Sequence, residues 1–178
     1  MPVLPISQMH TRHPGLTAAI AEAYHEAARV CLDRHHSSPV HMDLRDAKTQ
    51  RVDVQWIVAD QRVRDAWANK TDTTEAGAYA MVLAGVEVAR GHVALRRAET
   101  GTGADYYVGP PSASTEDLEN CFRLEISGVD SGDQAILEQR LTEKVDQASN
   151  GKGALPAIAG VVGFRIGWLL FADVLEPA

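Results

Sequence analysis

Three carboxylates, Glu75, Asp105 and Glu125, stand where the surrounding pattern predicts the start of a helix, the start of a strand and the middle of the next strand. If those two strands are neighbours, Asp105 and Glu125 lie close together. Two carboxylates with free oxygens bind Mg²⁺ while it keeps several of its waters. Such an ion activates water and stabilises charge on a phosphodiester oxygen. The sequence therefore predicts an Mg²⁺ or Mn²⁺ site on Asp105 and Glu125, with Glu75 assisting.

Each acid also has a simpler interpretation. With Asp72 as N-cap, Glu75 completes a capping box at the start of a helix. Asp105 follows a glycine-rich turn and serves equally well as a turn residue. Glu125, between Arg123 and Ser127 on the polar face of a strand, suits a surface ion pair across the sheet.

The elements that must position these acids are best defined after residue 72. The pattern predicts a helix over 73–90, rich in small residues and ended by Gly91. Strands follow over 92–99 and 104–109, joined by a tight turn at 100–103, and then over 121–128. A helix over 133–148 opens with a capping box of Ser131 and Gln134. Residues 155–174 form one bent strand or two short ones.

The first 70 residues predict a helix over 16–34, strands over 40–44 and 51–58, and a short helix over 60–69. No linker rich in proline, glycine or serine separates them from the rest. We therefore expect an N-terminal elaboration over 1–70 and a core over 71–178 that together form one compact unit. The fold class is α/β (α+β): a small mixed β-sheet flanked by helices, with an αβββαβ core over about 73–174.

This element order, with these acids, resembles the PD-(D/E)xK nuclease superfamily. The resemblance covers about 100 of the 178 residues. It matches Asp105 to the acid of the second strand, Glu125 to the glutamate of the Glu-x-Lys motif, and Glu75 to the acid of the first helix. It implies an Mg²⁺-dependent hydrolase that binds DNA or RNA and cleaves phosphodiesters.

One position departs from that motif, because Ser127 stands where the family has its lysine. A serine supplies no positive charge to the transition state. Lys144 and Arg140, on the following helix, are the candidate replacements, and Lys144 flanks the apolar face of that helix. In an active enzyme we expect the Lys144 ammonium within roughly 8 Å of Glu125. The alternative is a non-catalytic binding or assembly module, with a protein partner or self-association, that keeps a nuclease-like fold.

Composition narrows the class of protein. Hydrophobic residues make up 45% and charged residues 23%, as in ordinary globular proteins. The net charge is −7, and residues 71–178 hold 8 basic and 16 acidic side chains, which disfavours a nonspecific nucleic-acid coat. Cys31 and Cys121 suit buried free thiols. Without a signal peptide or an apolar span, we expect a cytoplasmic protein that does not enter the membrane.

Two further clusters carry weaker hypotheses. His35, His36, His41 and Asp43 have the residue types of a metal site, but adjacent histidines point apart. Tyr106 and Tyr107 have aromatic rings that can stack on a base, although on a strand one of the two faces the core.

Overall fold

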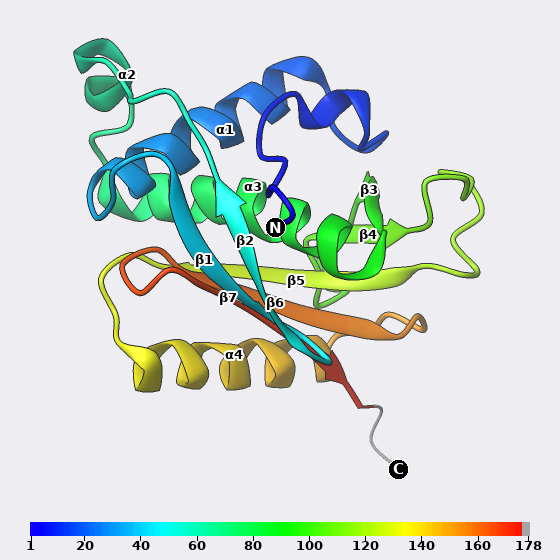
Figure 1. Cartoon of the computed structure of the whole chain (residues 1–178). Helices are drawn as coiled ribbons and strands as arrows, with labels where there is room; N and C mark the ends of the chain where they lie inside the picture. Colours follow the sequence, from blue (N-terminus) through cyan, green and yellow to red (C-terminus); the bar gives the residue numbers. More distant parts are fainter. Residues whose placement is uncertain (176–178) are drawn as a thin grey trace.

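The computed structural model describes residues 1–175, which form a mixed seven-stranded sheet with helices on both faces (Figure 1). The expected α/β class is confirmed. A 3-10 turn at Met9–Thr11 precedes the main elements, which are α1 (Ala18–Asp33), β1 (Val40–Arg45), β2 (Thr49–Val54), α2 (Gln61–Ala66), α3 (Lys70–Arg90), β3 (Val93–Arg97), β4 (Tyr106–Gly109), β5 (Phe122–Val129), α4 (Gln134–Ser149), β6 (Ala157–Gly163) and β7 (Trp168–Val174).

The strands lie in the order β2-β1-β7-β6-β5-β4-β3. Strands β3, β4 and β5 form an antiparallel meander, and β6 then pairs parallel to β5 after the crossover through α4. The elements from α3 to β6 thus follow the expected order αβββαβ. The hairpin of β1 and β2 extends the same sheet at its other side, where β1 pairs parallel to β7.

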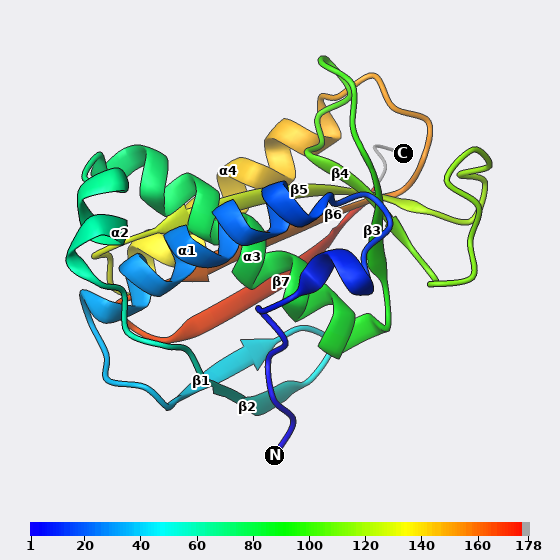
Figure 2. The same cartoon turned by 90° about the horizontal axis from the view of Figure 1, so that it is seen from above.

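Helices α1 and α3 cover one face of the sheet and α4 covers the other (Figures 1 and 2). Helix α3 lies between α1 and the sheet, and its small residues permit close packing on both sides. A Cβ at Gly77 would lie 3.1 Å from the backbone of Ala28 in α1, and one at Gly85 would lie 2.9 Å from the Phe171 ring in β7. Val82 and Val86 are buried, as expected for the core face of this helix.

The helix starts differ from the predicted capping boxes. Helix α3 begins three residues earlier, because the Asn69 side chain accepts hydrogen bonds from the backbone N–H groups of Thr71 and Asp72. Asp72 is therefore inside the helix and Glu75 is not part of a cap. Helix α4 is capped by Asp133, which accepts from the Ile136 N–H, so the predicted box at Ser131 is also wrong.

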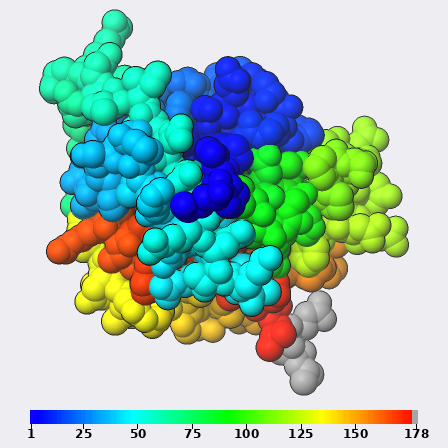
Figure 3. Space-filling model, viewed as in Figure 1, coloured from blue at the N-terminus to red at the C-terminus, as the bar shows by residue number. Residues whose placement is uncertain are grey.

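Other boundaries move by a few residues. The segment over 155–174, expected as one bent strand or two short ones, is two antiparallel strands, joined by a turn in which Gly167 has a φ of 68°. Strand β2 ends at Val54 rather than at residue 58, leaving Ile57 and Val58 exposed. The N-terminal segment lies along β2, where the Leu4 N–H donates to the Asp53 carbonyl (Figure 3). Within residues 1–175, no helix has the length and hydropathy needed to cross a membrane.

Candidate active site

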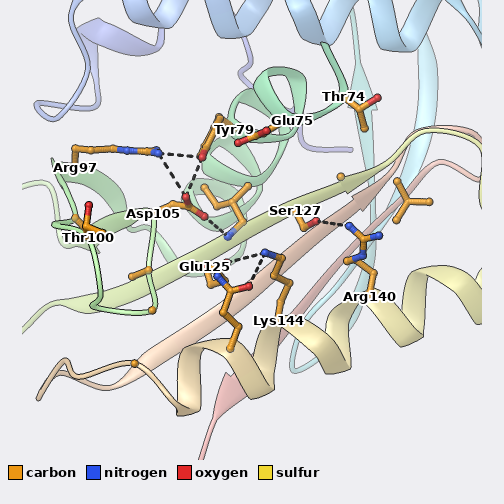
Figure 4. A pocket seen from close by; sticks show the side chains of 18 of the residues that line it. Thr74, Glu75, Tyr79, Arg97, Thr100, Asp105, Glu125, Ser127, Arg140 and Lys144 are labelled. Carbon is orange, nitrogen blue, oxygen red and sulfur yellow. Dashed lines mark hydrogen bonds and ion pairs between the residues drawn. The ribbon is translucent and has the colours of Figure 1, made fainter. Parts of the chain in front are cut away.

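The predicted acids converge on a cavity of about 1030 Å³ between the start of α3, the turn at 98–104, β5 and α4. Glu75, Asp105, Glu125, Arg140 and Lys144 all line it, and Figure 4 shows them facing one space from opposite sides. This side of β5 is open because β4 pairs only with the residues up to Leu124. Strand β4, which Asp105 directly precedes, and β5, which carries Glu125, are neighbours, as the sequence predicts.

Asp105 lies just before β4, and it forms hydrogen bonds with the backbone at the open edge of β5. Its backbone N–H donates to the Leu124 carbonyl at 2.8 Å, and its Oδ2 accepts from the Ile126 N–H at 2.8 Å. Backbone groups along β5 alternate between β6 and this edge: the Arg123 N–H donates toward β6. By that alternation the Ile126 carbonyl also faces the open edge, beside the Asp105 carboxylate.

Tyr79 and Arg97 are site residues that the sequence analysis missed. The Tyr79 hydroxyl donates to Asp105 Oδ1 at 2.9 Å, and Arg97 donates to the Tyr79 oxygen at 3.0 Å while lying 3.5 Å from Asp105 Oδ1. The Arg97 guanidinium also lies over the Tyr79 and Tyr106 rings, 4.8 and 4.9 Å from their centroids. Burial raises the pKa of Tyr79, and the negative charge of Asp105 adds to the rise, so this hydroxyl stays a proton donor.

Glu125 is 3% exposed and forms an ion pair with a lysine of α4, the helix that packs on this face of the sheet. Lys144 Nζ, on α4, lies 2.8 Å from Glu125 Oε1, so the expected proximity of Lys144 to Glu125 is confirmed. Burial raises the pKa of the Glu125 carboxyl; the hydrogen bond from Lys144 opposes that rise, and the charge of Asp105 adds to it. A second side chain of α4 contacts β5 at position 127: Arg140 donates to Ser127 Oγ at 3.3 Å.

Glu75 is exposed on the α3 side of the cavity and has no hydrogen-bond partner within the described residues. It is neither the predicted cap nor a direct neighbour of Glu125. Its carboxylate faces the cavity from the side opposite Lys144 (Figure 4). Glu75 therefore remains a candidate for an assisting role only.

The weaker clusters do not assemble. His36 donates to the Phe164 carbonyl at 2.6 Å, His35 lies 3.3 Å from Asp130, and His41 pairs with Asp53 at 2.5 Å, so the three rings have separate partners. Tyr106 and Tyr107 are both buried, which removes the expectation that one of them stacks on a base.

The donor set of the cavity suits a hard divalent cation. Asp105, Glu125 and the edge carbonyl of Ile126 are oxygen donors, the type that Mg²⁺ and Mn²⁺ prefer. No group of three histidine, cysteine or acidic side chains is close enough to hold a metal within residues 1–175. A cation at this site would have Asp105 and Glu125 as its side-chain ligands, with backbone and water completing the set.

Comparison of the chain with protein-family models, with curated proteins and with solved structures gave no significant match.

Proposed function

We propose that this protein is a nuclease-like hydrolase that cleaves phosphodiesters with Mg²⁺ or Mn²⁺. The observation that carries the proposal is the Lys144 ammonium, 2.8 Å from a buried glutamate in a cavity shared with Asp105. A lysine beside a glutamate, in one cavity with an aspartate, is the set of charges that the resemblance requires, and here α4 supplies the lysine that position 127 lacks. The order of α3, β3, β4, β5, α4 and β6 also supports the proposal.

Each of the groups in the cavity has its own role in the proposed hydrolysis. Asp105 and Glu125 hold the divalent cation, which supplies Lewis-acid stabilisation to a phosphoryl oxygen when bound. The Lys144 ammonium donates hydrogen bonds to the charge that develops on the phosphoryl group. Hydrolysis forms a bond from the water oxygen to phosphorus and breaks the bond to the leaving oxygen. That oxygen takes a proton that originates from the water, giving a phosphomonoester and an alcohol.

A second candidate function is a non-catalytic binding or assembly module. The observation in its favour is that both carboxylates already have partners: Asp105 accepts from Tyr79 and Ile126, and Glu125 pairs with Lys144. In that case these contacts are structural, and the divalent cation has no place in the protein's activity.

The test is cleavage of labelled DNA and RNA with Mg²⁺ or Mn²⁺, and with a chelator instead. We expect metal-dependent products from the parent and none from Asp105→Asn or Glu125→Gln. Glu116→Gln, an exposed acid in the loop before β5, is the matched control and should cleave like the parent. Cleavage that survives both site variants would contradict the proposal, and so would the absence of cleavage of every substrate.

Removal of the Tyr79 hydroxyl should weaken metal binding. Tyr79→Phe leaves the ring in place but takes away the donor to Asp105 Oδ1 and the acceptor for Arg97. Loss of a partner that orients a metal ligand typically weakens metal affinity by about 10- to 100-fold. We expect a change of that size in Mn²⁺ affinity by calorimetry, against none in Tyr107→Phe, whose hydroxyl bonds Glu99 and neither of the two proposed metal ligands. Equal affinities in the two variants would refute the role of Tyr79.

Metal binding should also depend on pH in a defined direction. A bound cation competes with a proton for Glu125, whose pKa is raised by burial. Mn²⁺ affinity should therefore fall on acidification at a pH above the ordinary glutamate range, near 4.3. Lys144→Met removes the contact that lowers this pKa, so the midpoint should move to a still higher pH. A midpoint that stays unchanged in Lys144→Met would show that Glu125 does not bind the metal.

A further inference from the structure

The positive charges of the cavity are already neutralised by the protein itself. Within residues 1–175, each lysine or arginine that lines the cavity lies within 4 Å of a carboxylate. The pairs are Lys70 with Asp130 at 2.9 Å, Arg97 with Asp105 at 3.5 Å, Arg140 with Glu143 at 3.1 Å and Lys144 with Glu125 at 2.8 Å.

The lining as a whole is slightly acidic. Against those four cations it holds five carboxylates: Glu75, Glu99, Asp105, Glu125 and Asp130. A protein that tracks a long nucleic acid neutralises many phosphates with unpaired lysines and arginines, which makes its affinity strongly salt-dependent. This cavity has no such track, and the part of the chain from residue 71 onward is itself acidic. Without a bound cation, the lining therefore offers a long polyanion no net electrostatic attraction.

The reacting groups are also recessed. Glu125 is 3% exposed, and the Lys144 side chain is 19% exposed, so a phosphorus atom must enter between α3 and α4 to reach them. The volume of about 1030 Å³ lies at the upper end of the range found for small-ligand sites. Tyr79 is the single aromatic residue among the described residues that line the cavity. Its ring already stacks on Tyr24, with the ring centroids 4.9 Å apart, and the Arg97 guanidinium lies over it. It therefore offers no free face on which a base can stack.

We infer that the substrate of this cavity is a short phosphodiester, of one or two nucleotides or a similarly small diester, and not a long strand or a duplex. The inference rests on the proposed function and specifies its substrate class. One phosphodiester brings a single negative charge, which a divalent cation held by Asp105 and Glu125 offsets. No contact to flanking phosphates is needed, and no base is read by stacking.

The experiment compares a thymidine dinucleotide with a single strand and a duplex of about 30 nucleotides, with Mn²⁺ at about 50 and about 200 mM salt. We expect the dinucleotide to be cleaved with a kcat/KM per diester at least equal to that of the long substrates. We also expect its rate to change less than about threefold between the two salt concentrations. Preference for a long substrate by 100-fold or more, with a loss of about 1000-fold at the higher salt, would overturn the inference while leaving the proposed function intact.

A variant tests the electrostatic reason directly. Glu143→Gln frees Arg140 from its ion pair and should raise activity on the long single strand, but not on the dinucleotide, by a few fold. Glu138→Gln, five residues earlier on α4, is the matched control and should change neither. An equal effect of Glu143→Gln on both substrates would contradict the charge argument.

If no substrate is cleaved, the proposed function fails. The preference for a short diester is then tested by binding measurements alone. Calorimetry with Mn²⁺ and a phosphorothioate dinucleotide should then give binding that Lys144→Met abolishes and Lys152→Met does not. Absence of dinucleotide binding, or tighter and salt-sensitive binding of the long duplex measured by fluorescence anisotropy, would overturn the inference in that case.

Discussion

Replacing Lys144 by methionine is expected to lower kcat for metal-dependent cleavage by about 100- to 1000-fold, the loss typical when one preorganised donor to the transition state is removed. The methionine keeps the apolar packing and most of the length of the side chain while it takes away the ammonium that lies 2.8 Å from Glu125. Lys152→Met is the matched control, because Lys152 is exposed in the loop after α4 and should be dispensable.

A second change separates a relocated lysine from a merely structural ion pair. Adding Ser127→Lys to Lys144→Met places the ammonium at the position that the nuclease-like motif prescribes, on the same strand as Glu125. Rates should recover at least about tenfold relative to Lys144→Met alone if the positive charge itself is what the reaction needs. Equal rates for Lys144→Met and the parent would eliminate the catalytic role of Lys144.

The largest loss of stability is expected when Arg123 is replaced. This side chain is 6% exposed and donates hydrogen bonds to backbone carbonyls in three separate segments. Its Nε donates to the Leu155 carbonyl at 2.8 Å, and its Nη1 donates to the carbonyls of Thr102 and Ala148 at 2.6 and 3.1 Å. Arg123→Met leaves these carbonyls without their donor. Each unsatisfied buried group costs about 1–3 kcal/mol, so we expect the free energy of unfolding to fall by about 3 kcal/mol or more.

Urea denaturation measures this loss, with Arg62→Met, an exposed arginine on α2, as the control that should change little. A loss below about 1 kcal/mol would show that water replaces the guanidinium at these carbonyls. Because Thr102 lies in the turn that borders the cavity, Arg123 also links the stability of the fold to the shape of the site.

Local pattern predicted much of the fold and of the site. Alternation along residues 121–128 identified the face of β5 that carries Glu125, and the apolar face of α4 placed Lys144 at its margin, within reach of the sheet. Both depend on the period of a single element, which the sequence displays directly.

The features that were missed depend on contacts between distant segments. Tyr79 reads as one more apolar residue on a buried helix, and only the fold brings its hydroxyl to Asp105, 26 residues later. The parallel pairing of β1 with β7 joins segments about 125 residues apart, and no local pattern announces it. The capping errors arose where several candidate residues compete: Asn69 and Asp72 both suit the N-cap of α3, and backbone geometry selects Asn69.

The most direct test of the account is a crystal structure of the protein grown with Mn²⁺, with data collected to reveal anomalous scattering from manganese. We predict one strong anomalous peak in the cavity, bonded to an oxygen of Asp105 and an oxygen of Glu125 at about 2.1–2.2 Å, with Lys144 Nζ displaced from Glu125 toward the solvent of the cavity. A map without a peak there at millimolar Mn²⁺, with Tyr79 still bonded to Asp105 and Lys144 still bonded to Glu125, would contradict the account.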